Sequence, residues 1–234
     1  MTQKTVLITG GNKGIGLDVT DLFYQSGFSV IVLARDFSTF PRDRYPDVHL
    51  VEFDLRRVDT IPQIIATLPP VDILINNAGI MNAIAPQAYD ADRIDEIMKI
   101  NLQAPVTLIN EVSKGMVKSG SGRIVNVASV AGEMGHPDVW YGISKAGLIN
   151  ATKSFSKLLG PCGIIINVVA PGPVETDMLN TIPGPRKEEL RSLTIKKRFA
   201  YSEEVASTIF WLGTQSTGYI NGTCIDINNG SFMR

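Results

Sequence analysis

Short runs of β-branched and other apolar residues alternate along this chain with segments whose apolar residues recur at helical spacing. Such runs, bounded by glycine, proline, asparagine or aspartate, are typical of buried strands. The strands are expected at residues 5–9, 29–33, 48–53, 73–75, 123–128, 164–169 and 223–227. Strands joined through helices pair in parallel, because the crossover returns the chain to the same end of the sheet. The pattern therefore predicts one α/β domain over residues 1–234, built on a doubly wound parallel sheet of about seven strands.

Composition narrows the class of protein. A chain of 234 residues with 44% hydrophobic residues can fill one sizeable core. The net charge of −1 offers no basic surface for a nucleic acid or an anionic membrane. Cys162 and Cys224 form neither a disulfide framework nor a metal-ligand spacing, and we expect no metal site. The sequence shows no secretory leader and no apolar stretch long enough to cross a membrane, so a cytoplasmic protein is expected.

A glycine-rich turn follows the first expected strand and opens the first expected helix. It reads Gly10-Gly11-Asn12-Lys13-Gly14-Ile15-Gly16. Glycines let the backbone turn tightly and approach a ligand closely, and a helix N-terminus offers unpaired N–H groups to phosphate oxygens. The stretch therefore predicts a cradle for the pyrophosphate of a dinucleotide, although its spacing differs from the commoner G-x-G-x-x-G.

The end of the second strand bears on which dinucleotide is bound. An acid at this point favours NAD, because it binds the ribose hydroxyls. Ala34 and Arg35 stand there instead, and Lys13 in the glycine turn can reach the same space. Two cations suit the additional 2′-phosphate of NADPH, which is the cofactor that we expect. The alternative is that Lys13 and Arg35 are ordinary surface cations, and Asp36 nearby is an acid of the kind that favours NAD.

A serine, a tyrosine and a lysine gather after the fifth expected strand. Ser129 ends the strand, and Tyr141 and Lys145 follow at a spacing of four at the start of the next helix. That spacing places both side chains on one helix face. A cation about 4 Å from the phenol, at an effective dielectric near 20, favours the phenolate by roughly 4 kcal/mol, or about three pKa units. The trio predicts an acid–base centre acting on a carbonyl. The alternative is a partly buried tyrosine and a surface lysine at ordinary helical spacing.

The long helix expected between residues 90 and 117 contains Pro105. Proline has no N–H, so the carbonyl of Asn101 loses its helical donor. A buried carbonyl needs another partner, and we expect a kink at Asn101 that holds a water for proton transfer. The alternative is a kink without a catalytic role.

Two further segments stand at carboxyl ends of strands, where open parallel sheets bind their ligands. Asn76-Asn77-Ala78-Gly79 follows the fourth strand, and its asparagines can fasten the strand end, unless the segment is simply a turn. Residues 171–177 follow the sixth strand. Residues 178–199, which include Pro183 and Pro185, are expected to form a mobile lid, and His136 is expected at the surface.

In this order, these residues resemble the short-chain dehydrogenase/reductase family over essentially the whole chain. The resemblance is carried by Thr9-Gly10-x-x-x-Gly14-x-Gly16, Asp54, Asn76-Asn77-Ala78-Gly79, Asn101, Ser129, Tyr141-x-x-x-Lys145 and Pro171-Gly172. It implies a Rossmann-like fold and hydride transfer between a nicotinamide cofactor and a carbonyl or alcohol.

The resemblance also implies roles for single residues. Tyr141 would be the acid and base, Lys145 would lower its pKa and bind the nicotinamide ribose, and Ser129 would orient the substrate. Asn101 would anchor a relay water. The cofactor would lie against Gly10, Asn12, Lys13, Gly14, Ile15, Gly16, Arg35, Asp54, Leu55, Asn77, Ala78, Gly79, Tyr141, Lys145, Pro171, Gly172, Val174 and Thr176. Asp54 would contact the adenine and Asn77 the adenosine ribose. Val174 and Thr176 would contact the carboxamide.

Within the family, the chain resembles in particular the 3-oxoacyl-acyl-carrier-protein reductases of bacteria, through Glu175-Thr176-Asp177-Met178 and Tyr219-Ile220-x-Gly222. This implies a homotetramer, or a homodimer, paired through the long helices and the last strand. Ser129 and Tyr141 are twelve residues apart, one fewer than in the common pattern, and the tail Asn228-Asn229-Gly230 also departs from it. Residues 118–121 and Cys162 stand where carrier-protein reductases tend to be more basic, which does not favour docking of a carrier protein.

The leading prediction is an NADPH-dependent reductase. It would convert a ketone, 3-oxoacyl-like or another small carbonyl, to a secondary alcohol with Tyr141 as the proton donor. One alternative is an alcohol dehydrogenase that works oxidatively on a sugar, a steroid or a secondary metabolite. Another is a dinucleotide sensor without catalysis, which would not need Ser129, Tyr141 and Lys145 together. No residue between Met178 and Arg198 requires an acyl chain over a ring, so the sequence names no substrate.

Overall fold

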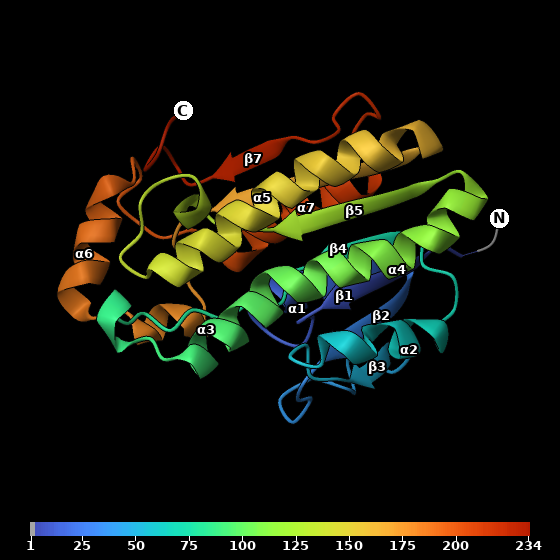
Figure 1. The fold of residues 1–234 in the computed structure, drawn as a ribbon, viewed down its shortest axis with the longest axis horizontal. Coiled ribbons are helices and arrows are strands. Elements are labelled where there is room, and N and C mark those ends of the chain that lie inside the picture. Colours follow the sequence, from blue (N-terminus) through green and yellow to red (C-terminus); the bar gives the residue numbers. More distant parts are fainter. Residues whose placement is uncertain (1–2) are drawn as a thin grey trace.

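Seven strands form one sheet in the computed structural model, which describes residues 3–234 (Figure 1). They are β1 Thr5–Thr9, β2 Ser29–Ala34, β3 His49–Glu52, β4 Ile73–Asn76, β5 Gly122–Val127, β6 Ile164–Pro171 and β7 Cys224–Ile227. Their order in the sheet is β3-β2-β1-β4-β5-β6-β7, and every neighbouring pair runs parallel. The predicted α/β class and doubly wound parallel sheet are therefore confirmed.

Helices cover both faces of this sheet (Figure 1). They are α1 Gly14–Gln25, α2 Ile61–Ala66, α3 Ala91–Met98, α4 Ala104–Ser119, α5 Val139–Leu159, α6 Gly184–Leu193 and α7 Ser202–Thr214. α1 and α7 pack on one face, and α2, α4 and α5 pack on the other. Within residues 3–234, none of these helices combines the length and the apolar character that crossing a membrane requires.

The alternation of side chains along β1 shows why its three central residues are all apolar. Val6 and Ile8 pack with α1 and α7, whereas Leu7 packs with α2 and α4. Successive side chains of a strand point to opposite faces, and here both faces are covered, so all of β1 is buried. The central strands of the sheet are thus rich in Val, Ile and Leu on both faces.

The segment between β2 and β3 is more ordered than its polar sequence indicated. We expected residues 37–47 to be a loop or a broken helix, and they form a loop. Three aromatic side chains nevertheless anchor it in the core, with Phe37 7%, Phe40 5% and Tyr45 2% exposed. Isolated aromatic residues between polar ones follow neither the helical nor the strand period, so periodicity could not find them.

The helix expected over residues 90–117 is interrupted next to Asn101. A π-helical turn spans Lys99–Gln103 and joins α3 to α4. In a π turn each carbonyl accepts from the fifth residue along, and the N–H of Ala104 accordingly donates to the Lys99 carbonyl. The carbonyl that faces the missing N–H of Pro105 is then that of Ile100, and Pro105 takes the second position of α4, in the first turn, where proline fits a helix best. The predicted irregularity is present, in the form of a π turn.

Candidate active site

Buried amides tie the carboxyl ends of the central strands to α5. Asn76, at the end of β4, pairs in register with Asn126 of β5 and donates from Nδ2 to the Asn126 Oδ1 at 2.9 Å. Asn126 donates in turn to the hydroxyl of Thr152 on α5 at 2.8 Å. These side chains are at most 1% exposed, and a hydrogen bond is strong in such surroundings. The chain of bonds fixes the position of α5 along the edge of the sheet.

The predicted trio converges at this edge. Ser129 follows β5, and Tyr141 and Lys145 lie on successive turns of α5, 7% and 4% exposed. The Lys145 ammonium lies 5.8 Å from the centre of the Tyr141 ring and donates to the carbonyl of Val127 at 2.9 Å. The Ser129 hydroxyl lies near enough to the phenol of Tyr141 to lower its pKa. The phenol, the ammonium and the hydroxyl are therefore neighbours, as the sequence predicted.

The acidity of the phenol differs from the expectation. Burial raises the pKa of Tyr141, the Ser129 hydroxyl lowers it, and the charge of Asp138 raises it. Burial also lowers the pKa of Lys145 to about 8. The predicted depression of the Tyr141 pKa by Lys145 is absent from the chain alone, because the ammonium is bonded to a carbonyl and desolvation dominates. Tyr141 in this structure is a phenol, and thus a proton donor.

The Asn101 side chain joins two parts of the site. Its Oδ1 accepts from the backbone N of Ile80 at 2.8 Å, and its Nδ2 donates to the Ile80 carbonyl at 2.9 Å. The same Nδ2 donates to the hydroxyl of Ser144 on α5 at 3.1 Å. Asn101 is fully buried. It therefore holds the segment after β4 against the helix that carries Tyr141, a role that the sequence did not reveal.

The glycine turn has the geometry that a dinucleotide needs. Gly10 and Gly14 have φ values of +64° and +52°, in the left-handed region that favours glycine. A Cβ on Gly16 would lie 2.0 Å from the Gly10 carbonyl oxygen. α1 begins at Gly14 with no side-chain cap from Lys13 and no acid in its first turn, which leaves its first N–H groups to an anion. These residues fit the pyrophosphate of a nicotinamide dinucleotide.

Gly16→Ala should therefore damage both the fold and the binding of a dinucleotide. The added methyl group forces the turn apart, and overpacking of this kind costs about 1–3 kcal/mol. The melting temperature should fall by roughly 2–12 °C, since each kcal/mol shifts a domain of this size by about 2–4 °C. Calorimetry and a cofactor titration measure the two effects. Gly115→Ala is the matched control, because a Cβ there meets nothing within 4 Å. Unchanged cofactor affinity in Gly16→Ala would contradict the cradle.

The side chain of Asn77 binds the start of the glycine turn through hydrogen bonds. Its Nδ2 donates to the carbonyls of Thr9 and Gly10, both at 3.1 Å, and its backbone N donates to the Thr9 hydroxyl at 3.0 Å. The predicted fastening of a strand end by an asparagine is confirmed here. Thr176 closes the turn from the other side, since a Cβ on Gly14 would lie 3.3 Å from its methyl carbon.

The groups that would select the cofactor lie beyond β2. Arg35 is exposed directly after the strand. The carboxylate of Asp36 accepts from the backbone N and the hydroxyl of Ser38 at 2.8 and 2.7 Å, which lowers its pKa. The Asp36 carbonyl accepts from Asn12 at 2.8 Å. Lys13 pairs with Asp177 at 3.5 Å, with both side chains mostly exposed, so this ion pair is weak. The acid that argued for NAD is thus engaged by its own loop.

The other predicted cofactor residues follow the same edge of the sheet. Asp54 comes after β3, and Arg56 donates to its carboxylate at 2.8 Å and lowers its pKa. Gly79 lies against Lys145, whose Nζ would be 3.1 Å from a Cβ at that position. Leu55 and Val174 are buried. The remaining positions are Ile15 at the start of α1, Ala78 after β4, and Pro171 and Gly172 at the end of β6.

Two side chains next to Tyr141 were not predicted as part of the site. Asp138 is 1% exposed and caps α5 by accepting from the Tyr141 N–H at 3.1 Å. His136, expected at the surface, is half-buried, and its ring centre lies 5.4 Å from that of Tyr141. An aspartate three residues before a helix-borne tyrosine is the sequence signal of an N-cap, and it would have placed Asp138.

Three further side chains collect on the other side of Ser129. Glu133, Cys224 and Asp226 bring potential metal-ligating atoms within 4.8 Å of one another. The guanidinium of Arg234 reaches both carboxylates at 3.0 Å and supplies positive charge there. This cluster joins the last residue of the chain to the turn that follows Ser129.

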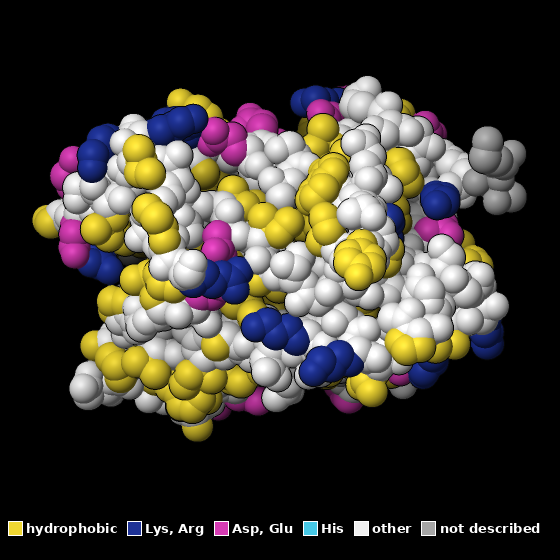
Figure 2. Space-filling model, turned by 90° about the horizontal axis from the view of Figure 1, so that it is seen from above, with side chains coloured by type: hydrophobic (Ala, Val, Ile, Leu, Met, Phe, Trp, Pro, Cys, Tyr) yellow, Lys and Arg dark blue, Asp and Glu magenta, His cyan; other side chains and the backbone are white. Residues whose placement is uncertain are grey.

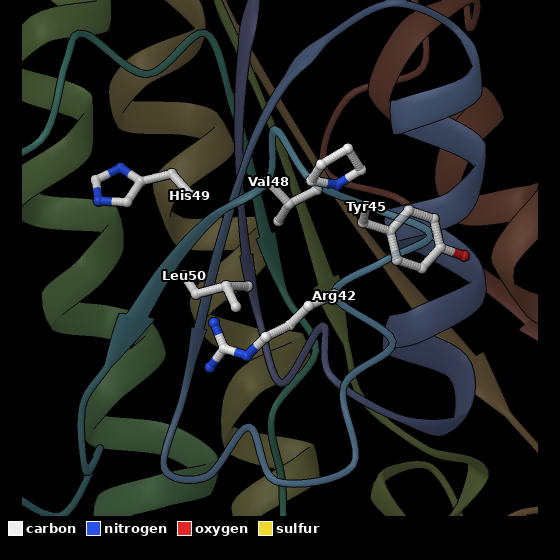
Figure 3. Close-up of a pocket in the computed structure, with 6 residues that line it drawn as sticks. Arg42, Tyr45, Val48, His49 and Leu50 are labelled. Atoms are coloured by element: carbon white, nitrogen blue, oxygen red, sulfur yellow. The ribbon is translucent and has the colours of Figure 1, made fainter.

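A surface hollow of about 410 Å³ lies far from these residues (Figure 3). Arg42, Tyr45 and Leu50 are among the side chains that line it. Figure 3 shows the Tyr45 ring turned toward α1, where its hydroxyl donates to Asp21 at 2.9 Å. β2, β1 and β4 separate β3, which borders the hollow, from β5. The hollow therefore contains no part of the catalytic trio.

Comparison with known proteins agrees with this geometry. A sequence model described as short chain dehydrogenase matches residues 4–186. The 3-oxoacyl-[acyl-carrier-protein] reductase of Rickettsia felis is 33% identical over 238 residues, which cover 100% of this chain and 98% of that protein. A solved structure of 4-hydroxyisoleucine dehydrogenase complexed with NADH matches with a TM-score of 0.93 and 28% identity, covering 98% of each chain. The 3-oxoacyl-[acyl-carrier protein] reductase from Brucella melitensis matches with a TM-score of 0.89 and 28% identity, covering 100% of this chain and 92% of that one.

The fold thus agrees with proteins that are similar over essentially the full length of this chain. The resemblance inferred from the sequence motifs is confirmed. The chain belongs to the short-chain dehydrogenase/reductase family and is an NAD(P)-dependent oxidoreductase that acts on CH–OH or C=O groups.

Proposed function

We propose that the protein is an NADPH-dependent reductase that converts a ketone to a secondary alcohol. The observation that carries the proposal is the position of Tyr141, a buried phenol near Ser129 at the edge of the sheet where the glycine turn also lies. A protonated phenol beside the bound substrate can give a carbonyl oxygen the proton that reduction requires.

The residues of the trio divide the work in this proposal. The bound cofactor supplies a hydride to the carbonyl carbon. Ser129 donates a hydrogen bond to the carbonyl oxygen, and Tyr141 gives that oxygen its proton, so that hydride and proton together complete the alcohol. Lys145 binds the nicotinamide ribose. It also stabilises the phenolate left behind, together with the positive charge of the oxidised ring.

Asn101 belongs to the proposal as the anchor of a water that returns a proton to Tyr141. Its side chain, bonded to Ile80 and Ser144, supports the position of its backbone carbonyl within the π turn at Lys99–Gln103. A water held by this carbonyl would connect the site with solvent through Lys145. A substitution at Asn101 should therefore slow turnover more than it weakens cofactor binding.

The preference for NADPH is supported by the loop after β2. Arg35 is free to approach a 2′-phosphate, whereas Asp36 already accepts two hydrogen bonds from Ser38. Lys13 is held only by a weak, exposed ion pair with Asp177. A phosphate would compete well for both cations, because charge-assisted bonds to phosphate are strong.

The proposed substrates are 3-oxoacyl compounds or other small ketones. The reductases of Rickettsia felis and Brucella melitensis support this class through their similarity to this chain. The likeness to 4-hydroxyisoleucine dehydrogenase supports a second candidate, the oxidation of a secondary alcohol in a small metabolite. The two candidates differ in direction and are separated by one assay.

A panel of carbonyl compounds, with NADPH consumption as the readout, tests the proposal. It should include an acetoacetyl thioester, simple 3-oxo esters, cyclic ketones and a matched panel of secondary alcohols with NADP⁺ and NAD⁺. We expect NADPH consumption with at least one 3-oxo compound. Turnover with alcohols and NAD⁺ alone would support the second candidate and contradict the first.

The proposal also covers the oligomeric state of the protein and its location in the cell. Exposed apolar side chains on α5 and before β7 would lie between subunits of a homotetramer or homodimer; Val139, Ile143 and Tyr219 are 41%, 44% and 99% exposed. Figure 2 shows apolar side chains among charged ones on the face turned upward in Figure 1, where β7 lies. Cys162 and Cys224 are free thiols, which suits the reducing cytoplasm. Residues 178–199 would act as a lid, and carrier-protein docking is not part of the proposal.

A further inference from the structure

A buried carboxylate lies at the amino end of α5, three residues before Tyr141. Asp138 is 1% exposed. Its Oδ1 accepts from the Tyr89 hydroxyl at 2.5 Å and from the Tyr141 N–H at 3.1 Å. Its Oδ2 accepts from the backbone N of Asn82 at 3.2 Å and of Ala83 at 3.0 Å. Two donors on each oxygen satisfy an ionised carboxyl group, which is costly to bury without them.

These donors belong to segments far apart in the chain. Asn82 and Ala83 lie in the loop of residues 80–85 after β4, which has no regular secondary structure. Ala83 has a φ of +54°, and this left-handed conformation costs a non-glycine residue roughly 1–2 kcal/mol. Such a backbone persists only where its surroundings fix it. The Asp138 carboxylate accepts both N–H groups of this stretch and so holds the loop in place.

The loop forms one side of the active site. Ile80, its first residue, is bonded through both backbone groups to Asn101. Ile80, Met81 and Tyr89 pack in the same apolar cluster as Tyr141. A shift of the loop would therefore change the space beside the phenol.

The charge of Asp138 acts on Tyr141 as well. Among residues 3–234, Asp138 has no ion-pair partner. The other groups facing the phenol are Lys145 on the next turn of α5, His136 in the preceding loop and the Ser129 hydroxyl after β5. The sides formed by α3 and by the 80–85 loop are apolar, apart from Tyr89. The fixed negative charge next to the phenol disfavours its ionised form and raises its pKa.

We propose that Asp138 is a positioning residue of the reductase. Its carboxylate fastens the 80–85 loop to the amino end of α5 and sets a negative charge at the turn of α5 that carries Tyr141. The proposal rests on the role of Tyr141 given above. It assigns to Asp138 two effects that a simple helix cap lacks. One is to hold the 80–85 loop, and the other is to act by its negative charge on Tyr141.

Asp138→Asn tests whether the carboxylate itself is needed, or only a side chain of its size and shape. The amide has the same shape, but it carries no charge and replaces one acceptor oxygen by a donor. Reduction needs the protonated phenol, so kcat/KM falls as the pH rises through the pKa of Tyr141. Without the negative charge that pKa decreases, and the basic limb of the profile should move to lower pH. The KM for the carbonyl should rise about tenfold, because the loop loses acceptors for its N–H groups. Hydrogen exchange at Asn82 and Ala83 should become at least about tenfold faster.

Two variants serve as controls. Tyr89→Phe keeps the charge and removes one of the four donors, so its KM should rise while the basic limb stays in place. Asp138→Ser keeps the ability to cap α5 but neither the charge nor the reach to the loop, and it should shift the limb as Asp138→Asn does. Wild-type KM and pH profile in Asp138→Ser would show that Asp138 is only a cap, and would overturn the proposal.

The outcomes distinguish this proposal from the proposed function. An unchanged basic limb in Asp138→Asn, in an enzyme that loses turnover on Tyr141→Phe, overturns the charge effect and leaves the reductase intact. Exchange in the unsubstituted protein tests the loop without any activity: the Asn82 and Ala83 amides should be the slowest of residues 81–85. Fast exchange there overturns the fastening even if a variant fails to fold. Absence of reduction of any carbonyl by the unsubstituted enzyme overturns the proposed function instead.

Discussion

Replacing Tyr141 by phenylalanine should lower turnover by roughly a thousandfold, the range expected for loss of a general acid, while the affinity for NADPH changes little. The substitution removes a single oxygen from a side chain that is 7% exposed, so the packing around the ring is preserved. Ser129 would still hold a carbonyl oxygen, but the described residues offer no second buried phenol near it. Steady-state kinetics and a fluorescence titration with NADPH measure the two quantities.

The control for this substitution is Tyr45→Phe. Tyr45 is also buried, at 2% exposed, and its pKa is raised to about 12. Its hydroxyl bonds to Asp21 on α1, on the side of the sheet where the hollow of Figure 3 lies. Turnover should be unchanged in this variant. Retention of more than about a tenth of the turnover in Tyr141→Phe would reject the assignment of the acid. Loss of NADPH binding would show that the phenol mainly supports the cofactor.

Arg35→Asp should weaken NADPH about a hundredfold or more and change the affinity for NADH by no more than a few-fold. Removing one partner of a charge pair costs about 2–5 kcal/mol, and every 1.4 kcal/mol is a factor of ten. The new carboxylate would also repel a 2′-phosphate, whereas the ribose hydroxyls of NADH can donate to it. Dissociation constants for both cofactors, measured at two salt concentrations, give the ratio and its electrostatic share.

Lys118→Asp is the control, because it makes the same change in net charge at a position remote from the expected cofactor site. Lys118 lies in the last turn of α4, at the end opposite the carboxyl edge of the sheet. The ratio of NADPH to NADH affinity should remain that of the unsubstituted protein. Equal weakening of both cofactors by Arg35→Asp would contradict the selection of a 2′-phosphate by Arg35.

The regular part of the fold could be predicted because a sheet that is buried on both faces requires strands rich in apolar residues. β1 and β6 consist mainly of apolar residues, and the helices between strands carry their own periodicity. The aromatic anchors Phe37, Phe40 and Tyr45 could not be found in this way, since each packs singly from an irregular loop. The form of the break at Asn101 was also beyond the sequence. Proline shows that a helix must adjust, but both a kink and a π turn relieve it.

The site could be predicted where one local element sets the geometry. Tyr141 and Lys145 share a helix, so their spacing alone brings them together. The acidity of Tyr141 could not be predicted, because it depends on burial and on the bond from Lys145 to Val127. Asp138 was missed for a related reason. Its partners Asn82 and Ala83 lie in a distant loop, and only the folded chain brings them to the carboxylate.

The strand order has a consequence for how the protein acquires activity. β1 to β4 make a contiguous half-sheet that carries the glycine turn, and β5 to β7 make another that carries Ser129 and supports α5. The halves meet along one seam, where Ile73 to Asn76 pair with Arg123 to Asn126. Neither half by itself has both a place for the dinucleotide and a proton donor, so activity during refolding should appear only when this seam closes. A cofactor that touches both halves then opposes their separation, by about 2.7 kcal/mol at a hundred times its Kd.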